Sequence, residues 1–243
     1  MGRVSGVDGV SIAYMTEPGE RPVLLVHGFA SSADLTWEMT GWVRALADAG
    51  RGSVRVDLRG HGASDAPTDP ASYSPALLAA DLALVLDEER LSQVDVIGYS
   101  MGAQAARVLA CLHPDRVRRL VLGGIGTQEQ FAVWGAEKFV GALERDEPLV
   151  DPAAADLVAA ITASSVIHSG AAAACIRGMA AHPMTAMPAQ PTLVVAGGAD
   201  DVAADAAALA TQLGAQFVSI PKRTHRNAVS ARAFKQAALE FLA

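Results

Sequence analysis

The chain of 243 residues is 51% hydrophobic and 19% charged, with a formal net charge of −7. These proportions exclude a disordered chain, and the length fits a single α/β domain, which can run to roughly 250 residues. The negative charge, without a basic stripe of Lys and Arg, argues against nucleic acid as a partner. No apolar run reaches the length of a signal peptide or of a membrane span. We therefore expect a cytoplasmic protein that acts on a small-molecule substrate away from membranes, and the sequence carries no signal of an oligomeric state.

Short runs rich in Val, Ile and Leu alternate with longer stretches of helical spacing along most of the chain. In chain order, strands are predicted at 10–15, 22–26, 53–57, 94–98, 117–122, 191–196 and 215–220. Helices are predicted at 37–49, 75–89, 101–113, 203–213 and 226–242. Runs such as VLLV, VDVIG and TLVVA are apolar on both faces, which is typical of parallel strands covered by helices on both sides. The order of these elements indicates βαβ units and an α/β fold.

The region 126–187 breaks this alternation. It contains helical stretches at 129–144, 152–163 and 171–181 without a clear strand among them. We predict that it forms a helical lid, inserted into a core made of residues 1–125 and 188–243. Ala-rich low complexity is the alternative interpretation of the same stretch.

Gly98-Tyr99-Ser100-Met101-Gly102 stands between the apolar run VDVI and the helical run AQAARVLACL. This is the G-x-S-x-G pattern in the strand–turn–helix context that a nucleophile elbow needs. Glycine is required at both ends because the turn is so tight that a side chain there would collide with neighbouring backbone. The pattern predicts that Ser100 is a nucleophile with its hydroxyl exposed above the sheet.

A serine hydroxyl is a weak nucleophile near neutral pH, so it needs a base and a group that fixes the tautomer of that base. In elbow-bearing α/β folds the acid follows the serine along the chain, and the histidine comes last. Asp200 and Asp201 follow the apolar run PTLVVA, and His225 directly precedes the last predicted helix. These residues are therefore expected at the carboxyl edge of the sheet, on the same side as Ser100.

Together with VLLVHGF at 23–29 and DLRGHGAS at 57–64, these pieces resemble the α/β-hydrolase superfamily over nearly the whole chain. The resemblance is closest to small esterases, lactonases, cofactor-free haloperoxidase-like enzymes and carbon–carbon bond hydrolases. It implies a mostly parallel, eight-stranded sheet with helices on both faces and a small helical lid after the sixth strand. It also implies an oxyanion hole formed by the backbone NH groups of Phe29 and Met101.

Within this resemblance, counting along the Gly-x-x-Asp motif selects Asp200 as the acid, with Asp201 as the minor option. His225 is the predicted base because of its late position. The other histidines lie in turns, before a proline or in the predicted lid, and they are His27, His61, His113, His168 and His182. The family usually has glycine before its catalytic histidine, whereas this chain has Thr224 there and Arg226 after it.

The predicted reaction is acyl transfer to water, in which Ser100 attacks a carbonyl, His225 takes its proton and Asp200 stabilises the imidazolium. Small, fairly apolar esters or lactones are the expected substrates, because the predicted lid is rich in aromatic and aliphatic side chains around 131–140. Phe29 and Trp134 are the candidate pocket residues, although Trp134 could equally belong to the interior of the lid.

Two other functions remain open at this point. The same triad could cleave a carbon–carbon bond in a diketone from aromatic breakdown, or it could be retained in a small-molecule receptor that signals through lid movement. The chain has no phosphate-binding loop, zinc-protease motif or paired CxxC, so neither a metal nor an organic cofactor is expected.

Overall fold

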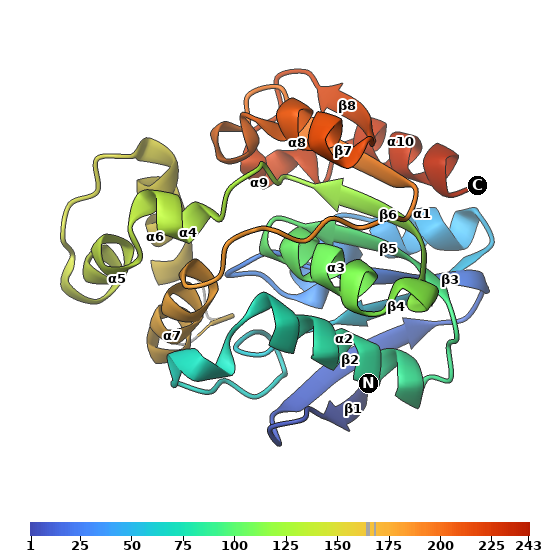
Figure 1. The fold of residues 1–243 in the computed structure, drawn as a ribbon, viewed down its shortest axis with the longest axis horizontal. Helices are drawn as coiled ribbons and strands as arrows, with labels where there is room; N and C mark the ends of the chain where they lie inside the picture. The colour runs from blue at the N-terminus through green and yellow to red at the C-terminus, as the bar shows by residue number, and fades with distance from the viewer. Residues whose placement is uncertain (164–165, 168) are drawn as a thin grey trace.

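The computed structural model describes residues 1–163, 166–167 and 169–243, and its centre is an eight-stranded sheet (Figure 1). The strands are β1 (Gly2–Ser5), β2 (Ser11–Glu17), β3 (Glu20–Val26), β4 (Arg51–Val56), β5 (Val94–Tyr99), β6 (Val117–Gly123), β7 (Thr192–Gly197) and β8 (Gln216–Ile220). Their order across the sheet is β1-β2-β4-β3-β5-β6-β7-β8. The pairs β1–β2 and β2–β4 are antiparallel, and the other pairs are parallel. The predicted mostly parallel, eight-stranded sheet is confirmed.

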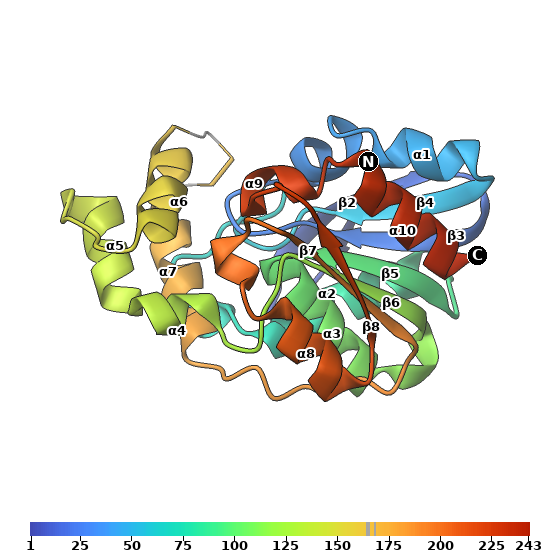
Figure 2. The same ribbon diagram turned by 90° about the horizontal axis from the view of Figure 1, so that it is seen from above.

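Helices cover both faces of the sheet (Figure 2). The core helices are α1 (Trp42–Asp48), α2 (Pro75–Glu88), α3 (Met101–Leu112), α8 (Ala206–Leu213), α9 (His225–Ala228) and α10 (Arg232–Leu242). In Figure 2, α1 and α10 lie on one face, and α2, α3 and α8 lie on the other. Because side chains alternate along a strand, Val23 and Leu25 of β3 join the apolar cluster under α1 and α10, whereas Leu24 and Val26 join the cluster under α2 and α3. Two apolar faces explain why the buried part of this strand, Val23–Val26, is apolar at every position.

Between β6 and β7 the chain leaves the sheet and forms a group of helices at one end of it, on the left of Figure 1. This inserted segment contains α4 (Gln130–Trp134), α5 (Ala136–Arg145), α6 (Pro152–Thr162) and α7 (Ser169–Ala180). Within it α5 packs on α6 and α7, and α7 also contacts the short 3₁₀ turn Pro70–Ser72 of the core. His168, which the sequence places in this segment, lies outside the described residues.

The start of the inserted segment is tied to the loop after β7. The Asp205 carboxylate accepts hydrogen bonds from both the backbone NH and the hydroxyl of Thr127.

Among the described residues, every helix is too short or too polar to span a lipid bilayer.

The structure differs from the sequence prediction at several element ends. Residue patterns do not predict β1, because its residues alternate only between half-buried and exposed. The predicted helix at 37–49 is a five-residue π-helical turn, Asp34–Glu38, followed by α1, and Gly41 with φ 78° separates the two. Gly135, with φ 81°, divides the predicted helix at 129–144 into α4 and α5. The predicted helix at 203–213 begins later, at Ala206, because Asp201–Ala203 forms a separate 3₁₀ turn. The predicted helix at 226–242 is two helices, α9 and α10, because Ala231 between them is extended.

Candidate functional site

Ser100 occupies the sharp turn between β5 and α3. Its backbone has φ 54° and ψ −123°, a region that residues with a side chain rarely adopt. A Cβ atom at Gly98 would lie 2.5 Å from the carbonyl oxygen of Gly102, and one at Gly102 would lie 2.3 Å from that of His27. Both positions therefore require glycine. The backbone NH of Ser100 donates to the carbonyl of Gly123 at 2.8 Å, which holds the turn at the carboxyl edge of the sheet.

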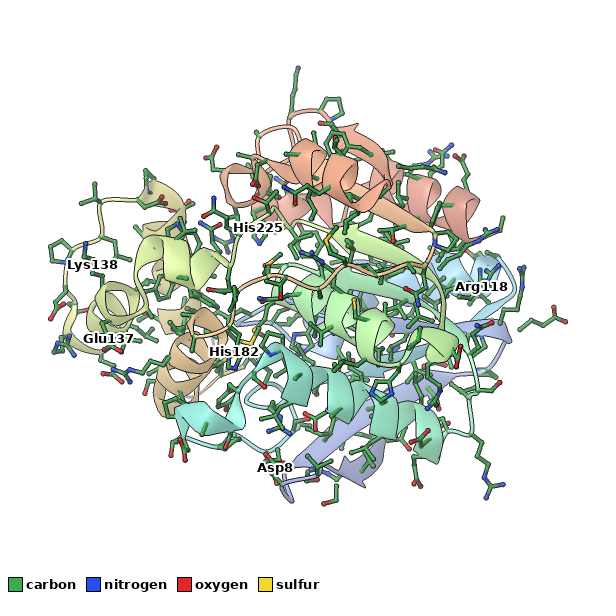
Figure 3. All side chains as sticks on the ribbon, in the orientation of Figure 1. Asp8, Arg118, Glu137, Lys138, His182 and His225 are labelled. Carbon is green, nitrogen blue, oxygen red and sulfur yellow. The ribbon has the colours of Figure 1, made fainter. Side chains whose placement is uncertain are left out.

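A chain of hydrogen bonds joins Ser100, His225 and Asp200. Nε2 of His225 lies 3.0 Å from Oγ of Ser100, and Nδ1 lies 3.0 and 3.1 Å from the two carboxylate oxygens of Asp200. His225 begins α9, where Thr224 and Asn227 form a capping box that fixes the backbone carrying the imidazole. Figure 3 shows His225 between the sheet and the inserted segment. The structure brings the three predicted side chains together in the order that a nucleophile, a base and an orienting acid require.

The carboxylate of Asp200 is held by backbone as well as by the imidazole. Its side chain is fully buried, and the NH groups of Val202 and Ala203 each donate to Oδ1 at 3.1 Å. The neighbouring Asp201 is exposed and lies at the wall of a nearby cavity, while the hydrogen bonds with Nδ1 of His225 are made by Asp200. Of the two acids that the sequence offers, the geometry favours Asp200.

Tyr99 is a residue near the site that the sequence analysis did not single out. Its hydroxyl donates to the backbone carbonyl of His225 at 2.5 Å, and its ring centroid lies 5.4 Å from that of the imidazole. Burial, together with the charge of Asp200, raises the pKa of Tyr99 well above its usual value, so the hydroxyl stays protonated and remains a donor. Its position directly before Ser100 is the signal that could have identified it.

The loop after β3 lies directly against the elbow. A Cβ atom at Gly28 would lie 3.1 Å from Cβ of Ser100. Within the described part of the chain, the backbone NH groups of Phe29 and Met101 have no hydrogen-bond acceptor. Both groups are therefore available to an oxygen that develops negative charge beside the serine.

Two buried histidines tie this loop to the turn after β4. Nε2 of His61 accepts from the NH of Ala30 at 3.1 Å, and Nε2 of His27 accepts from the NH of Leu58 at 3.0 Å. In each ring Nδ1 lies close to a backbone carbonyl and so carries the proton. Burial lowers the pKa of His27 to about 4 and that of His61 to about 3, which keeps both rings neutral. These two histidines hold backbone in place and do not contact Ser100 Oγ.

A cavity of about 400 Å³ is lined by Ser100 and His225 and by residues of the inserted segment. Phe29 and Trp134 both belong to its wall. The ring of Phe29 meets that of Phe131 edge to face at 4.9 Å, and Trp134 stacks on Phe139 with centroids 5.6 Å apart. Trp134 is therefore both part of the cavity wall and part of the interior of the inserted segment.

Two buried polar residues of the cavity wall were also not singled out by the sequence analysis. Gln104 comes from α3, and Glu129 caps the N-terminus of α4. Gln104 follows Ser100 by four residues, a spacing that places both on one face of a helix and could have identified it. As to metals, the described residues contain no group of three or more His, Cys, Asp and Glu side chains that could hold an ion.

Residues 21–146 match the family model described as alpha/beta hydrolase fold. An epoxide hydrolase of Caballeronia sordidicola is 36% identical over 112 residues, which are 46% of this chain and 33% of that protein. A 2-hydroxy-6-oxononadienedioate/2-hydroxy-6-oxononatrienedioate hydrolase of Burkholderia vietnamiensis is 37% identical over 144 residues, covering 55% of this chain and 48% of that protein. The chain thus spans less than half the length of either relative. The crystal structure of an enol-lactonase from Burkholderia xenovorans, at 24% identity, shares the fold over 99% of both chains with a TM-score of 0.81.

Proposed function

The chain belongs to the alpha/beta hydrolase fold family, and on that premise we propose that it hydrolyses small, fairly apolar carboxylic esters or lactones through an acyl-enzyme on Ser100. The observation that carries the proposal is the hydrogen-bond chain from Asp200 through His225 to Oγ of Ser100. A carboxylate at Nδ1 favours the tautomer in which Nε2 is free to accept the hydroxyl proton. The arrangement therefore activates a serine oxygen for attack on a carbonyl carbon.

In the proposed first step Oγ of Ser100 attacks the carbonyl carbon while Nε2 of His225 takes the hydroxyl proton. The NH groups of Phe29 and Met101 bind the resulting oxyanion, and one such donor typically contributes about 10²- to 10³-fold in rate. His225 then returns the proton to the departing alcohol oxygen. A water molecule, deprotonated by the same imidazole, attacks the acyl-enzyme, and His225 returns that proton to Oγ of Ser100 as the acid is released.

The cavity supports a small, largely apolar substrate. A volume of about 400 Å³ is in the lower part of the range of small-molecule pockets, roughly 300–1,000 Å³. Aromatic and aliphatic side chains make up much of its wall, including Phe29, Phe131 and Trp134. Such a wall favours an apolar acyl chain or lactone ring, because burying apolar surface against it is favourable and few polar groups of the substrate lose their water.

One relative is named an epoxide hydrolase, but a serine nucleophile does not suit that reaction. If Oγ of Ser100 opened an epoxide, the product would be an ether between the serine and the substrate. An ether has no carbonyl carbon for water to attack, so the serine would not be regenerated. An acyl-enzyme, by contrast, is an ester that water can cleave, which favours esters and lactones as substrates.

The charge of the cavity wall also favours neutral esters over the diacid type of substrate named for the Burkholderia vietnamiensis relative. Among the described residues, the cavity wall carries three carboxyl side chains, from Glu129, Asp156 and Asp201. The one Lys or Arg there is Arg226, which is exposed to solvent. A substrate with two carboxylates would therefore meet more negative than positive charge.

The test is hydrolysis of p-nitrophenyl butyrate by the parent protein, Ser100→Ala and the control Ser92→Ala, whose side chain is exposed and which precedes β5, at the end of that strand opposite the elbow. We expect steady multiple turnover that Ser100→Ala lowers by about 10⁴-fold or more and that Ser92→Ala leaves unchanged. Activity of Ser100→Ala near the parent level would refute the assignment. A single burst of nitrophenol without further turnover would instead favour the receptor hypothesis.

A further inference from the structure

The helix that carries the base, α9, is too short to hold its own position. It has four residues, His225–Ala228, which make about one helical turn. Forming a first turn fixes several backbone angles in return for one hydrogen bond, so an isolated turn of this length is unstable in water. The capping box of Thr224 and Asn227 holds its N-terminus. The position of the imidazole therefore depends on contacts between α9 and the rest of the fold.

Two buried aromatic side chains donate hydrogen bonds to the backbone at the two ends of α9. At its start, the hydroxyl of Tyr99 donates to the carbonyl of His225 at 2.5 Å. Just beyond its end, Nε1 of Trp42 donates to the carbonyl of Val229 at 2.7 Å. Tyr99 is 5% exposed and Trp42 is fully buried, so water competes little for either bond. Both ends of the helix are thus held by side chains from other elements.

The hydroxyl of Tyr99 is itself held in place, because the end of β6 fits closely around the ring. A Cβ atom at Gly123 would lie 2.7 Å from Cδ2 of Tyr99, and one at Gly124 would lie 2.7 Å from Cζ. The Tyr99 ring also packs on that of Phe234, with centroids 6.2 Å apart. Phe234 in turn meets Trp42 edge to face at 5.3 Å. The two donors therefore belong to one packed group of rings in the apolar cluster under α1 and α10.

Tyr99 also directly precedes the nucleophile along the chain. One residue thus joins the two partners of the catalytic hydrogen bond, through its peptide bond to Ser100 and through its hydroxyl to His225. A phenol is rigid apart from two side-chain torsions, so this connection restricts how far Nε2 lies from Oγ. The present separation of 3.0 Å is within the range in which a base can take a proton, roughly 2.6–3.2 Å. A small shift of α9 would take the imidazole out of that range.

We propose that Tyr99 and Trp42 are positioning residues that act through His225. Their hydrogen bonds to the two ends of α9 set the distance over which the imidazole takes and returns the proton of Ser100. The inference deepens the proposed function and rests on it. In this role neither side chain touches the reacting atoms. The imidazole moves a proton in both the formation and the breakdown of the acyl-enzyme, so both steps depend on these two bonds.

The experiment removes each donor and keeps a ring, in Tyr99→Phe and Trp42→Phe. Tyr73→Phe is the matched control for the first, because Tyr73 is equally buried and its hydroxyl donates to the carbonyl of Pro67 at 2.7 Å, between β4 and α2. Trp37→Phe is the matched control for the second. Nε1 of Trp37 is buried and has no hydrogen-bond partner among the described residues, so this change removes an indole without removing a bond.

The parent protein and the four variants are compared on p-nitrophenyl butyrate. Tyr99→Phe should lower kcat by about 10- to 100-fold and leave KM within about twofold, because a 1 Å misplacement in an active site can cost 10²-fold. Trp42→Phe acts at the far end of α9 and should lower kcat by about 3- to 10-fold. The two control variants should change kcat by less than about twofold. Tyr99→Phe and Tyr73→Phe should lower the unfolding temperature equally, by about 2–4 °C, since each loses one buried hydrogen bond.

Combination with His225→Ala tests whether Tyr99 acts through the imidazole. In that background Tyr99→Phe should change the residual rate by less than about twofold, because the group that it positions is absent. A further loss as large as that in the parent background would overturn the proposal. Equal losses of kcat in Tyr99→Phe and Tyr73→Phe would also overturn it, because a general loss of stability would explain both.

The rate at which a fluorophosphonate labels Ser100 separates these outcomes from failure of the proposed function. Labelling needs an activated serine whatever the natural substrate is. If the parent protein hydrolyses no ester but Tyr99→Phe is labelled about 10-fold more slowly than Tyr73→Phe, the substrate class is wrong and the positioning role stands. Equal labelling rates in these two variants would overturn the positioning role.

Discussion

The loops at the carboxyl edge of the sheet and the inserted segment are held in place by different forces. Backbone hydrogen bonds fix the loops: the NH of Ser100 binds a carbonyl of the next strand, and two NH groups hold Asp200. The interior of the inserted segment is built from packed rings instead, with Phe131 and Trp134 arranged around Phe139 at 5.6 Å each. Backbone positioning survives most side-chain changes, whereas ring packing depends on the side chains themselves. We infer that chemistry resides in the first region and substrate choice in the second.

The largest effect that this comparison predicts is at the acid of the edge loops. Asp200→Asn should lower kcat for a short ester by about 10³- to 10⁴-fold, because an amide at this position does not stabilise the working tautomer of the imidazole or its charged form. Asp201→Asn is the matched control, one residue away and exposed, and it should change kcat by less than about threefold. Steady-state kinetics on p-nitrophenyl acetate measures both. Equal losses would mean that the acid role is shared or misassigned.

The two regions should also respond to acid in opposite directions. The folded-state pKa values of His27 and His61 lie below the ordinary value of about 6.5, so the unfolded chain binds more protons as the pH falls. Their stabilisation is complete above pH 6.5, roughly, and is lost as the pH falls toward 4. Burial raises the pKa of Glu129 in the folded protein. The protonated side chain therefore contributes to the stability of the folded state in acid, and this contribution is lost as the pH rises through the folded-state pKa.

Urea unfolding at pH 7 and pH 5 checks this contrast. Each buried histidine should remove about 2 kcal/mol of unfolding free energy between these two values, so His61→Gln, which keeps an acceptor but does not titrate, should lose about that much less than the parent. Glu129→Gln should be more stable than the parent at pH 7 and should lose that advantage in acid. The same pH dependence for His61→Gln and the parent would contradict the buried, neutral state of the ring.

The smallest expected effect is at the wall of the inserted segment. Trp134→Ala should enlarge the cavity and shift the preferred acyl chain toward longer esters, with kcat for the acetate ester changed by only a few-fold. Val133→Ala is its control, because Val133 is exposed beside it. Kinetics over a series from acetate to octanoate measures the preference. A large loss of kcat on the acetate ester would show that the inserted segment also positions the catalytic groups.

The sequence predicts those parts of the fold that local physics dictates. Gly98 and Gly102 are required by contacts of 2.5 and 2.3 Å, so the elbow could be predicted from five residues. The buried strands are apolar on both faces and are equally clear. β1 is missed because a four-residue, half-exposed strand has no distinctive pattern. The breaks at Gly41 and Gly135 depend on positive φ angles, which spacing of apolar residues does not reveal.

The residues of the candidate site likewise include some that the sequence predicts and some that it does not. Ser100, Asp200 and His225 follow loops whose order along the chain is informative, and the structure brings them within hydrogen-bond distance. Gln104 has only its four-residue spacing from Ser100 as a signal, and Glu129 has none, because a polar residue in a predicted helical stretch normally indicates a solvent-facing side. Both are buried in the folded chain, and burial of this kind depends on contacts between distant parts of the chain, such as that between Cys175 of α7 and Met101 of α3.

The bond between Thr127 and Asp205 has a consequence for how such a protein can diversify. Asp205 lies on the loop that also carries Asp200. The first residues of the inserted segment are therefore hydrogen-bonded to the loop that orients His225. A chimera that exchanges the helices after Thr127 but keeps this residue preserves its hydrogen bonds to Asp205. A junction placed before Thr127 would leave the Asp205 carboxylate without its donors. Selection or engineering can therefore change substrate preference by exchanging the helices of the inserted segment as a unit, provided that the junction lies after Thr127.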